Sequence, residues 1–274
     1  MKLVNRPIRY LIPILIGTVI AFFLALRKNQ PNQTITASPR DFPAIRAEGV
    51  IRAVTEYNTI GFFAVEDTVA GFHHDLLQAF ARDHDLRVEF TPIMDFQQRF
   101  EGLYNGIYDI IASSLPLSSE LKDTMAFTHP VLLGKQVLVQ RKAAHDSLQI
   151  NSLLQLAGKT VYVPKHSPNI FRIRNLSEEI GDSIHLKEIE KYGSEQLISL
   201  VAHGQIDFAI CDEQLALAAA DSLPQLAIHL PVSFTLFYAW GINKQSPQLL
   251  DTLNLWLDKF KQSKEYRRIY KKYF

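Results

Sequence analysis

Two stretches of the sequence repeat one pattern and decide the fold. Residues 103–123 read LYNGIYDIIASSLPLSSELKD, and residues 200–213 read LVAHGQIDFAICDE. In both, a helix-like run ends at a glycine, an aspartate stands three positions after that glycine, and an apolar strand then opens into polar residues. Because the same unit is written twice, the sequence predicts two lobes of like construction.

The parts of this pattern have physical reasons. Gly106 and Gly204 stand where a helix must end in a left-handed residue, a conformation that glycine adopts without strain. Residues 110–112 and 208–210 are continuous apolar runs, as expected of strands buried on both faces of a sheet. We therefore expect both runs to be central strands of open sheets covered by helices.

The rest of the chain alternates between strand-like and helix-like segments. The predicted strands are residues 50–54, 87–90, 110–112, 135–140, 160–163, 185–189, 206–210, 226–230 and 234–242. The predicted helices are residues 74–84, 96–104, 153–156, 170–180, 194–203, 214–220, 247–261 and 264–273. This alternation predicts the α/β class. Ligands bind outside the carboxyl ends of strands in such sheets, so residues 113–115 and 211–213 should face one another across a cleft.

The composition argues against several function classes. The 274 residues carry 29 Lys and Arg against 28 Asp and Glu, so no nucleic-acid-binding surface is indicated. The basic cluster at residues 264–274 is interpreted as the solvated side of a last helix. Cys211 is the one cysteine, which excludes an intramolecular disulfide, and we interpret it as a buried apolar residue. His73 and His74 would point to different faces of a helix and no cofactor motif occurs, so no metal and no cofactor are expected.

The N-terminus carries a membrane signal. Basic residues precede an apolar run at residues 10–26, and fewer follow it, which favours a cytoplasmic N-terminus. We interpret the run as an uncleaved transmembrane signal-anchor, with a cleaved signal peptide as the alternative. Residues 1–9 would then be a cytoplasmic stub and residues 27–44 a polar tether. Residues 45–274 would form a domain in the periplasm, which is part of the cell envelope.

The chain resembles the bacterial extracellular solute-binding proteins of family 3, which have the type II periplasmic-binding fold. Residues 71–76, GFHHDL, resemble the family's G-F-x-x-D-L helix start, and residues 113–130, SSLPLSSELKDTMAFTHP, are similar to its signature after the first repeated strand. The resemblance covers about residues 45–274. It implies a two-lobed domain, with lobe one at residues 45–140 and 234–274, lobe two at residues 141–233, and hinges near residues 140–141 and 231–234.

A closer resemblance is to the non-catalytic N-terminal module of the membrane-bound lytic murein transglycosylase F family. The segments that carry it are IRAEGVIRAVT and LVAHGQIDFAICDEQLALAAADSLPQLAI, together with the N-terminal apolar run. That family adds a lysozyme-like catalytic domain after this module. Because the sequence stops at Phe274, we expect no such domain here and do not carry lytic activity over.

The resemblance implies a site for an α-amino acid. Asp212 matches the family's lobe-two aspartate, which accepts the ligand ammonium; the alternative reading is a helix N-cap. The lobe-one arginine that grips the carboxylate is missing, because Leu121 stands at its aligned place with Lys122 beside it. Three explanations stay open: Lys122 substitutes, the ligand lacks a free α-carboxylate, or the pocket is degenerate.

Further candidates surround these positions. Ser113, Ser114 and Ser118 could bind a carboxylate or a peptide amide through hydroxyl and backbone N–H groups, or could belong to an ordinary turn. Ser167 precedes a predicted helix and could bind an anion or cap that helix. The family places aromatic walls over its ligand where the candidates here are Tyr57, Phe62 and Phe63.

The sequence therefore predicts a membrane-anchored periplasmic solute-binding protein rather than an enzyme. Its ligand would be a small molecule, namely an amino acid, short peptide or peptidoglycan fragment, held between lobes that close about a hinge. The alternatives are a secreted receptor that serves an ABC permease, a dehydratase-like enzyme, and a regulatory module that partners a cell-wall enzyme. No nucleic-acid partner is expected.

Overall fold

The structure is a computed structural model that describes residues 38–142, 149–190 and 192–274. The transmembrane segment predicted at residues 10–26 lies outside the described residues, as does most of the tether. Within the described ranges, the helices are too short or too polar to cross a bilayer.

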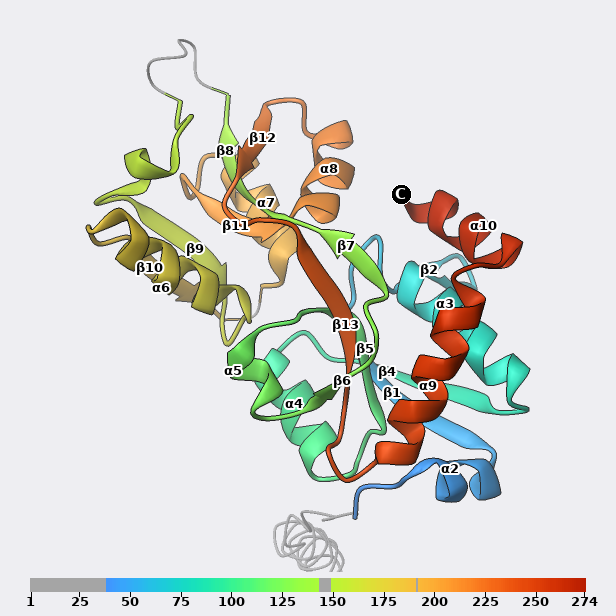
Figure 1. The fold of residues 1–274 in the computed structure, drawn as a ribbon. Helices are drawn as coiled ribbons and strands as arrows, with labels where there is room; N and C mark the ends of the chain where they lie inside the picture. Colours follow the sequence, from blue (N-terminus) through green and yellow to red (C-terminus); the bar gives the residue numbers. More distant parts are fainter. Residues whose placement is uncertain (1–37, 143–148, 191) are drawn as a thin grey trace, which may run out of the picture. The chain divides into compact units, whose positions relative to one another are not determined.

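The first lobe is built on a six-stranded sheet with the order β4-β1-β5-β13-β6, and β7 also pairs with β13. Strand β1 (Val50–Thr55) runs parallel to β4 (Arg87–Pro92) and β5 (Ile110–Pro116). The antiparallel partners around β13 (Leu236–Ile242) are β5, β6 (Ala126–Phe127) and β7 (Leu132–Gly134). Figure 1 shows β13 running back through this sheet from the second lobe.

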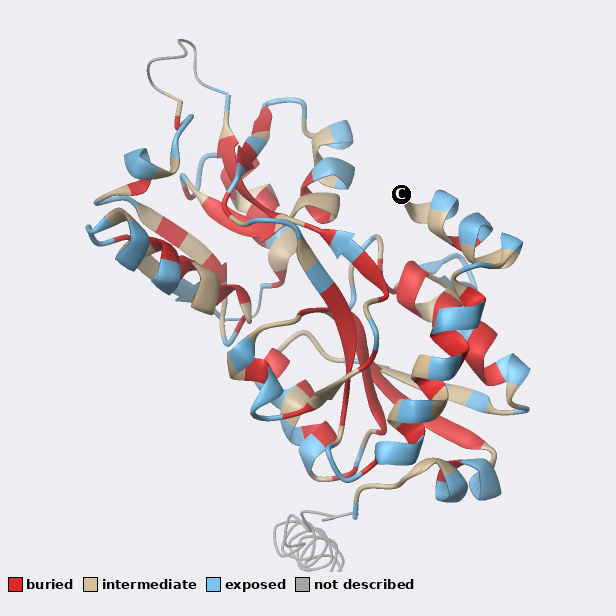
Figure 2. Ribbon diagram, in the orientation of Figure 1, coloured by how far each residue is buried: buried red, intermediate tan, exposed pale blue. Residues whose placement is uncertain are grey.

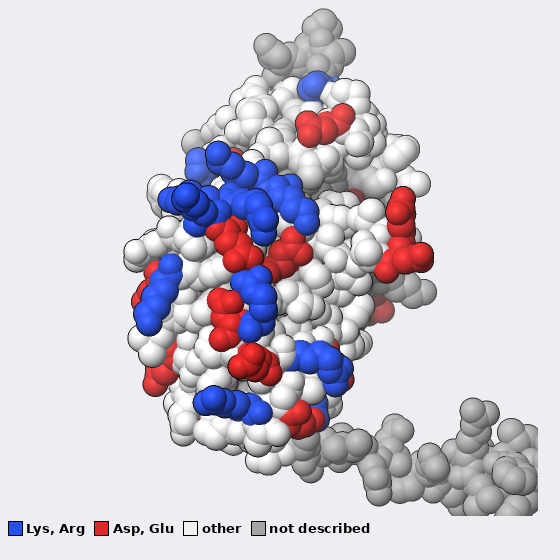
Figure 3. All heavy atoms as spheres, turned by 90° about the vertical axis from the view of Figure 1, so that its right-hand side faces the viewer, with Lys and Arg blue, Asp and Glu red and all other residues white. Residues whose placement is uncertain are grey.

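Helices cover both faces of this sheet. One face packs against α2 (Phe42–Glu48), α3 (Phe72–Asp83), α9 (Pro247–Phe260) and α10 (Lys264–Tyr273). The other face packs against α4 (Phe96–Tyr104) and α5 (Ser119–Lys122). A short hairpin of β2 (Phe63–Val65) and β3 (Thr68–Ala70) precedes α3. Basic side chains gather over α10, and Arg267, Arg268 and Lys271 are exposed there, as the sequence indicated (Figure 3).

The second lobe is built on a five-stranded sheet with the order β10-β9-β11-β8-β12. Its strands are β8 (Gln136–Arg141), β9 (Thr160–Pro164), β10 (His185–Ile189), β11 (Ala209–Asp212) and β12 (Leu226–Pro231). One face packs against α7 (Ser194–Ala202) and α8 (Glu213–Ser222), and the other packs against η2 (Leu153–Leu156) and α6 (Asn169–Ile180).

The two repeated strands lie in separate sheets, as predicted. Strand β5 is in the first sheet and β11 is in the second. Gly106 and Gly204 precede them with φ angles of 72° and 74°, the left-handed geometry that the sequence required. Both strands are buried along most of their length because helices cover both faces, and Figure 2 shows them in red at the centre of each lobe. The predicted two-lobed α/β architecture is therefore confirmed.

Two of the predicted domain boundaries differ from the structure, one between the lobes and one at the tether. Strand β8 pairs with β11 and β12, so Gln136 to Gln140 belong to the second sheet and the first crossing lies at Lys135, not at residues 140–141. An alternating strand pattern does not reveal which sheet the strand joins. The tether also ends earlier than residue 44, because Asp41 accepts a hydrogen bond from the Phe42 N–H and begins α2, which buries Ile45 completely.

Candidate ligand-binding cleft

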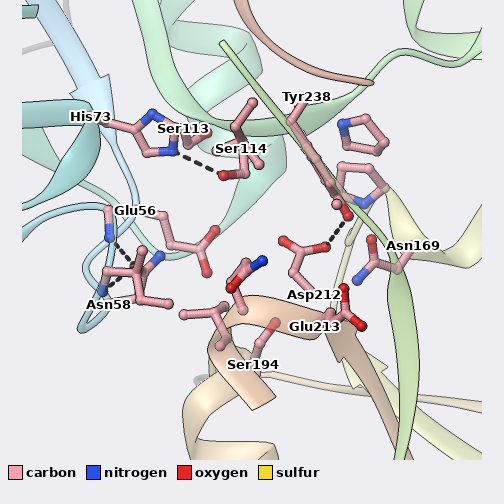
Figure 4. Close-up of a pocket in the computed structure, with 18 of the residues that line it drawn as sticks. Glu56, Asn58, His73, Ser113, Ser114, Asn169, Ser194, Asp212, Glu213 and Tyr238 are labelled. Atoms are coloured by element: carbon pink, nitrogen blue, oxygen red, sulfur yellow. Dashed lines mark hydrogen bonds between the residues drawn. The ribbon is translucent and has the colours of Figure 1, made fainter. Parts of the chain in front are cut away.

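A cleft with about 730 Å³ of empty space, including the part open to solvent, lies between the lobes (Figure 4). Both lobes line it, largely through residues at the carboxyl ends of strands. The lining consists of Glu56, Asn58, Ile60, Gly61, His73, Ser113, Ser114, Pro116, Leu132, Gly134, Lys135, Ser167, Pro168, Asn169, Ser194, Asp212, Glu213, Gln214, Leu215, Tyr238 and Phe274. The cleft thus lies where open α/β sheets bind ligands.

Asp212 is held across the cleft by the other lobe. It ends β11 and precedes α8, but its side chain does not cap that helix. Instead, the Tyr238 hydroxyl on β13 donates a hydrogen bond of 2.6 Å to Asp212 Oδ1 (Figure 4). This bond joins the two sheets directly.

The Asp212 carboxyl is energetically unusual. It is partly buried, and this burial raises its pKa from 3.8 to about 7; the hydrogen bond from Tyr238 opposes the shift, while the nearby Glu56 charge adds to it. A buried carboxylate without a full charge partner is unfavourable in a folded protein. The site therefore favours a ligand group that brings a positive charge to Asp212.

The first-lobe edge carries a fixed hydrogen-bond relay. The Trp240 indole Nε1–H donates to His73 Nδ1 at 3.0 Å, so the His73 ring proton is on Nε2, which donates to Ser114 Oγ at 2.9 Å. His73 is only 3% exposed, and burial lowers its pKa to about 3, so the ring is neutral. Since Ser114 Oγ accepts from His73, the Ser114 hydroxyl hydrogen is available to donate into the cleft.

Two further polar groups complete this edge. Ser113 is 4% exposed, and its Oγ has no hydrogen-bond partner among the described residues. Asn58 Oδ1 accepts hydrogen bonds from the backbone N–H groups of Ile60 and Gly61, at 3.2 and 2.6 Å, and so fixes the loop after β1. A buried hydroxyl without a partner is costly, so Ser113 Oγ is a natural contact for a ligand.

Glu56 forms an ion pair with Arg99, which is not a lining residue of the cleft. Arg99 on α4 donates from Nη1 to Glu56 Oε2 at 3.0 Å and to the Ile93 carbonyl at 3.2 Å, and its side chain is 3% exposed. Glu56 thus presents one edge to the cleft while a buried guanidinium holds the other.

Other contacts join the lobes beside the cleft. The backbone N–H of Thr59 donates to Glu195 Oε1 at 2.8 Å, and the Thr59 hydroxyl bonds to the same oxygen. On the side of α4, His166 Nδ1 lies 3.0 Å from Asp95 Oδ2. These contacts join the two lobes in addition to the hydrogen bond between Tyr238 and Asp212.

The structure brings together some of the residues predicted from the sequence. Ser113, Ser114, Ser167 and Asp212 all line the cleft. Ser167 is buried, and its Oγ accepts a hydrogen bond from the N–H of Asn169 at the start of α6. The agreement follows from the rule that strand ends meet at one edge of a sheet.

The remaining predicted residues lie elsewhere. Ser118 Oγ caps α5 by accepting from the Leu121 N–H, and Lys122 is exposed on that helix. Phe62 packs against Phe90 and His74, and Phe63 lies edge-on to Tyr273. Tyr57 is 44% exposed and is not among the lining residues. None of these three aromatic residues is among those that line the cleft.

Sequence reasoning missed several lining residues, notably Glu56, His73 and Tyr238. Glu56 follows β1 directly, so the strand-end rule that found Ser113 would also have found it. His73 and Tyr238 reach the cleft from a helix and from an antiparallel strand, and no local pattern marks them.

The sequence is similar to that of several curated proteins. A membrane-bound lytic murein transglycosylase F from Desulfosudis oleivorans is 30% identical over 231 residues, which are 84% of this chain and 50% of that protein. The same enzyme from Photobacterium profundum is 26% identical over 242 residues, which are 85% and 45% of the two chains. The chain thus spans about half the length of these relatives.

Solved structures share the fold. An ancestral arginine-binding protein, solved with glutamine and with arginine, superposes with a TM-score of 0.72 at 26% identity over 82% of this chain and 98% of that one. A substrate-binding protein of an ABC uptake transporter from Streptococcus pneumoniae, with bound histidine, gives 0.75 at 19% identity over 85% and 95%. The family model of the bacterial extracellular solute-binding proteins, family 3, matches residues 51–274, so the chain belongs to that family.

Proposed function

We propose that this chain is a membrane-anchored periplasmic solute-binding protein whose lobes close on an amino acid, a short peptide or a peptidoglycan fragment. The observation that carries the proposal is the bond from Tyr238 to Asp212, which joins the two sheets at a partly buried carboxyl that lines the cleft. A ligand that contacts both edges would favour the closed arrangement over an open one by its differential affinity. The named ligands of the superposed proteins, which are amino acids, support this ligand class.

A regulatory role in the cell wall is the second candidate. It is favoured by the sequence similarity to membrane-bound lytic murein transglycosylases. The relative from Desulfosudis oleivorans is 30% identical to this chain, whereas the ancestral arginine-binding protein is 26% identical. In that role the chain would sense a peptidoglycan fragment and act on a cell-wall enzyme rather than deliver a solute to a permease. A pull-down of the anchored chain with either type of partner separates the two roles.

Thermal-shift screening with amino acids, dipeptides and muropeptides tests the binding function. A ligand at a hundred times its dissociation constant should stabilise the folded chain by about 2.7 kcal/mol. Small-angle scattering should then show a smaller radius of gyration with ligand than without it. If no compound of these classes changes the melting temperature, the proposed function is wrong.

The anchor is tested separately. Mass spectrometry of the mature protein from membranes should find residues 10–26 retained, and an N-terminus that begins after this run would favour the secreted receptor instead.

A further inference from the structure

The described residues that line the cleft include more acidic than basic side chains. The lining includes the carboxylates of Glu56, Asp212 and Glu213, and among its described residues Lys135 is the one Lys or Arg. Glu56 lies near enough to Asp212 for their like charges to interact. Arg99 offsets the charge of Glu56, so Asp212 and Glu213 remain against Lys135, and this excess of carboxylates favours cations in the cleft.

The arginine that pairs with Glu56 is committed elsewhere. Arg99 lies behind Glu56, donates to Glu56 and to the Ile93 carbonyl, and is not a lining residue. Leu121 is 5% exposed and packs in an apolar cluster with Phe96. No guanidinium fork of the kind that grips a carboxylate is therefore presented by these two positions.

The first-lobe edge offers uncharged groups in their place. Ser113 Oγ is buried without a partner among the described residues, and Ser114 is held by the neutral ring of His73. Hydroxyl groups can bond to a ligand hydroxyl, amide or ether, but they supply no positive charge to offset the hydration that a carboxylate loses on burial. A free carboxylate in the cleft would also face protein carboxylates of the same sign, which is unfavourable.

We infer that the cleft binds an organic ammonium whose carboxyl group is absent or masked, and that it discriminates against free α-amino acids. The inference rests on the proposed binding function and specifies its ligand class. The ammonium would be placed at Asp212, where it supplies the missing positive charge, and the neutral end of the ligand would lie against Ser113 and Ser114. A peptide N-terminus fits this class when its distant carboxylate lies outside the cleft.

Matched pairs of small molecules test the inference on the full chain. Isothermal titration compares L-alaninol with L-alanine, cadaverine with L-lysine, and tyramine with L-tyrosine, at about pH 8, where most of these amines carry a proton. In at least one pair, the amine should bind at least about tenfold more tightly than the amino acid. Equal or tighter binding of the amino acids, or no binding in any pair, overturns the inference.

Variants locate the interaction. Asp212→Asn should weaken binding of the preferred amine at least about tenfold, since it removes the charge partner. Asp207→Asn is the matched control, because Asp207 lies in the same lobe with a side chain 73% exposed and does not line the cleft. Lys135→Met removes the cation of the lining and should strengthen amine binding, because an ammonium would no longer face a like charge. If Lys135→Met instead abolishes binding of a free amino acid, Lys135 is a carboxylate anchor and the inference fails.

The outcomes separate this inference from the proposed function. Binding of free amino acids in the thermal-shift screen, with no preference for amines, refutes only the ligand class. Absence of binding in both the screen and the matched pairs refutes the binding function itself.

Discussion

Replacing Asp212 with asparagine should stabilise the ligand-free protein at alkaline pH. The pKa of Asp212 is about 7 in the folded protein against a usual value of 3.8, because burial penalises its charge. The folded state therefore binds a proton at Asp212 more tightly than the unfolded state does. The resulting contribution to the free energy of unfolding is fully present below pH 3.8 and is lost as the pH rises through about 7. At 1.36 kcal/mol per pH unit, the full difference is about 4 kcal/mol.

Asparagine keeps an oxygen that can accept the bond from the Tyr238 hydroxyl, but it never ionises. The stability gap between Asp212→Asn and the parent protein should therefore open between pH 4 and pH 7 and reach about 4 kcal/mol above pH 7. Urea denaturation at a series of pH values measures this gap. The control is Asp251→Asn, which changes an exposed aspartate on α9. A gap that stays constant with pH, or that matches the control, would refute the assignment of Asp212 as a partly buried carboxylate whose charge destabilises the fold.

Three further variants probe the contacts around the cleft. Tyr238→Phe removes the bond to Asp212 that joins the sheets and should cost about 1 to 3 kcal/mol in urea denaturation; an unchanged midpoint would show that the bond adds nothing. Arg99→Met leaves Glu56 without its buried partner and should cost about 3 kcal/mol, whereas a double variant with Glu56→Gln should recover part of the loss. Asp95→Ala removes the N-cap of α4 and should cost about 1 kcal/mol in thermal unfolding; the cost should shrink in acid, because the pKa of Asp95 is lowered by hydrogen bonds from Gln98 and His166 that outweigh its partial burial.

Much of the fold could be predicted because its signals are local. Periods in the apolar residues mark the strands and helices, and the positive φ angles of Gly106 and Gly204 confirm that these glycines end their helices. The twin strands were found because a strand buried on both faces must be apolar throughout. Helix α2 was missed because it is short, and its cap at Asp41 stands in a polar stretch that looks like a linker.

The site could be predicted only in part, for a similar reason. Ser113 and Ser114 lie in the carboxyl-terminal half of β5 and Asp212 ends β11, and the end of the apolar run in each strand is visible in the sequence. Tyr238 and His73 reach the cleft only after β13 has returned between β5 and β6 and after α3 has packed on the sheet. These are tertiary events, and the residues look locally like any buried aromatic in a strand or helix.

The return strand β13 has an optical consequence. It carries Tyr238, whose hydroxyl touches Asp212, and two positions later it carries Trp240, whose indole bonds to the histidine that holds Ser114. The chain contains only two tryptophans, and the other, Trp256, bonds to Asp83 on the outer helices. Trp240 is therefore a native fluorophore bonded to the first-lobe edge of the cleft, so its emission should report occupancy without any attached dye, and Trp256→Phe would leave Trp240 as the one tryptophan that emits.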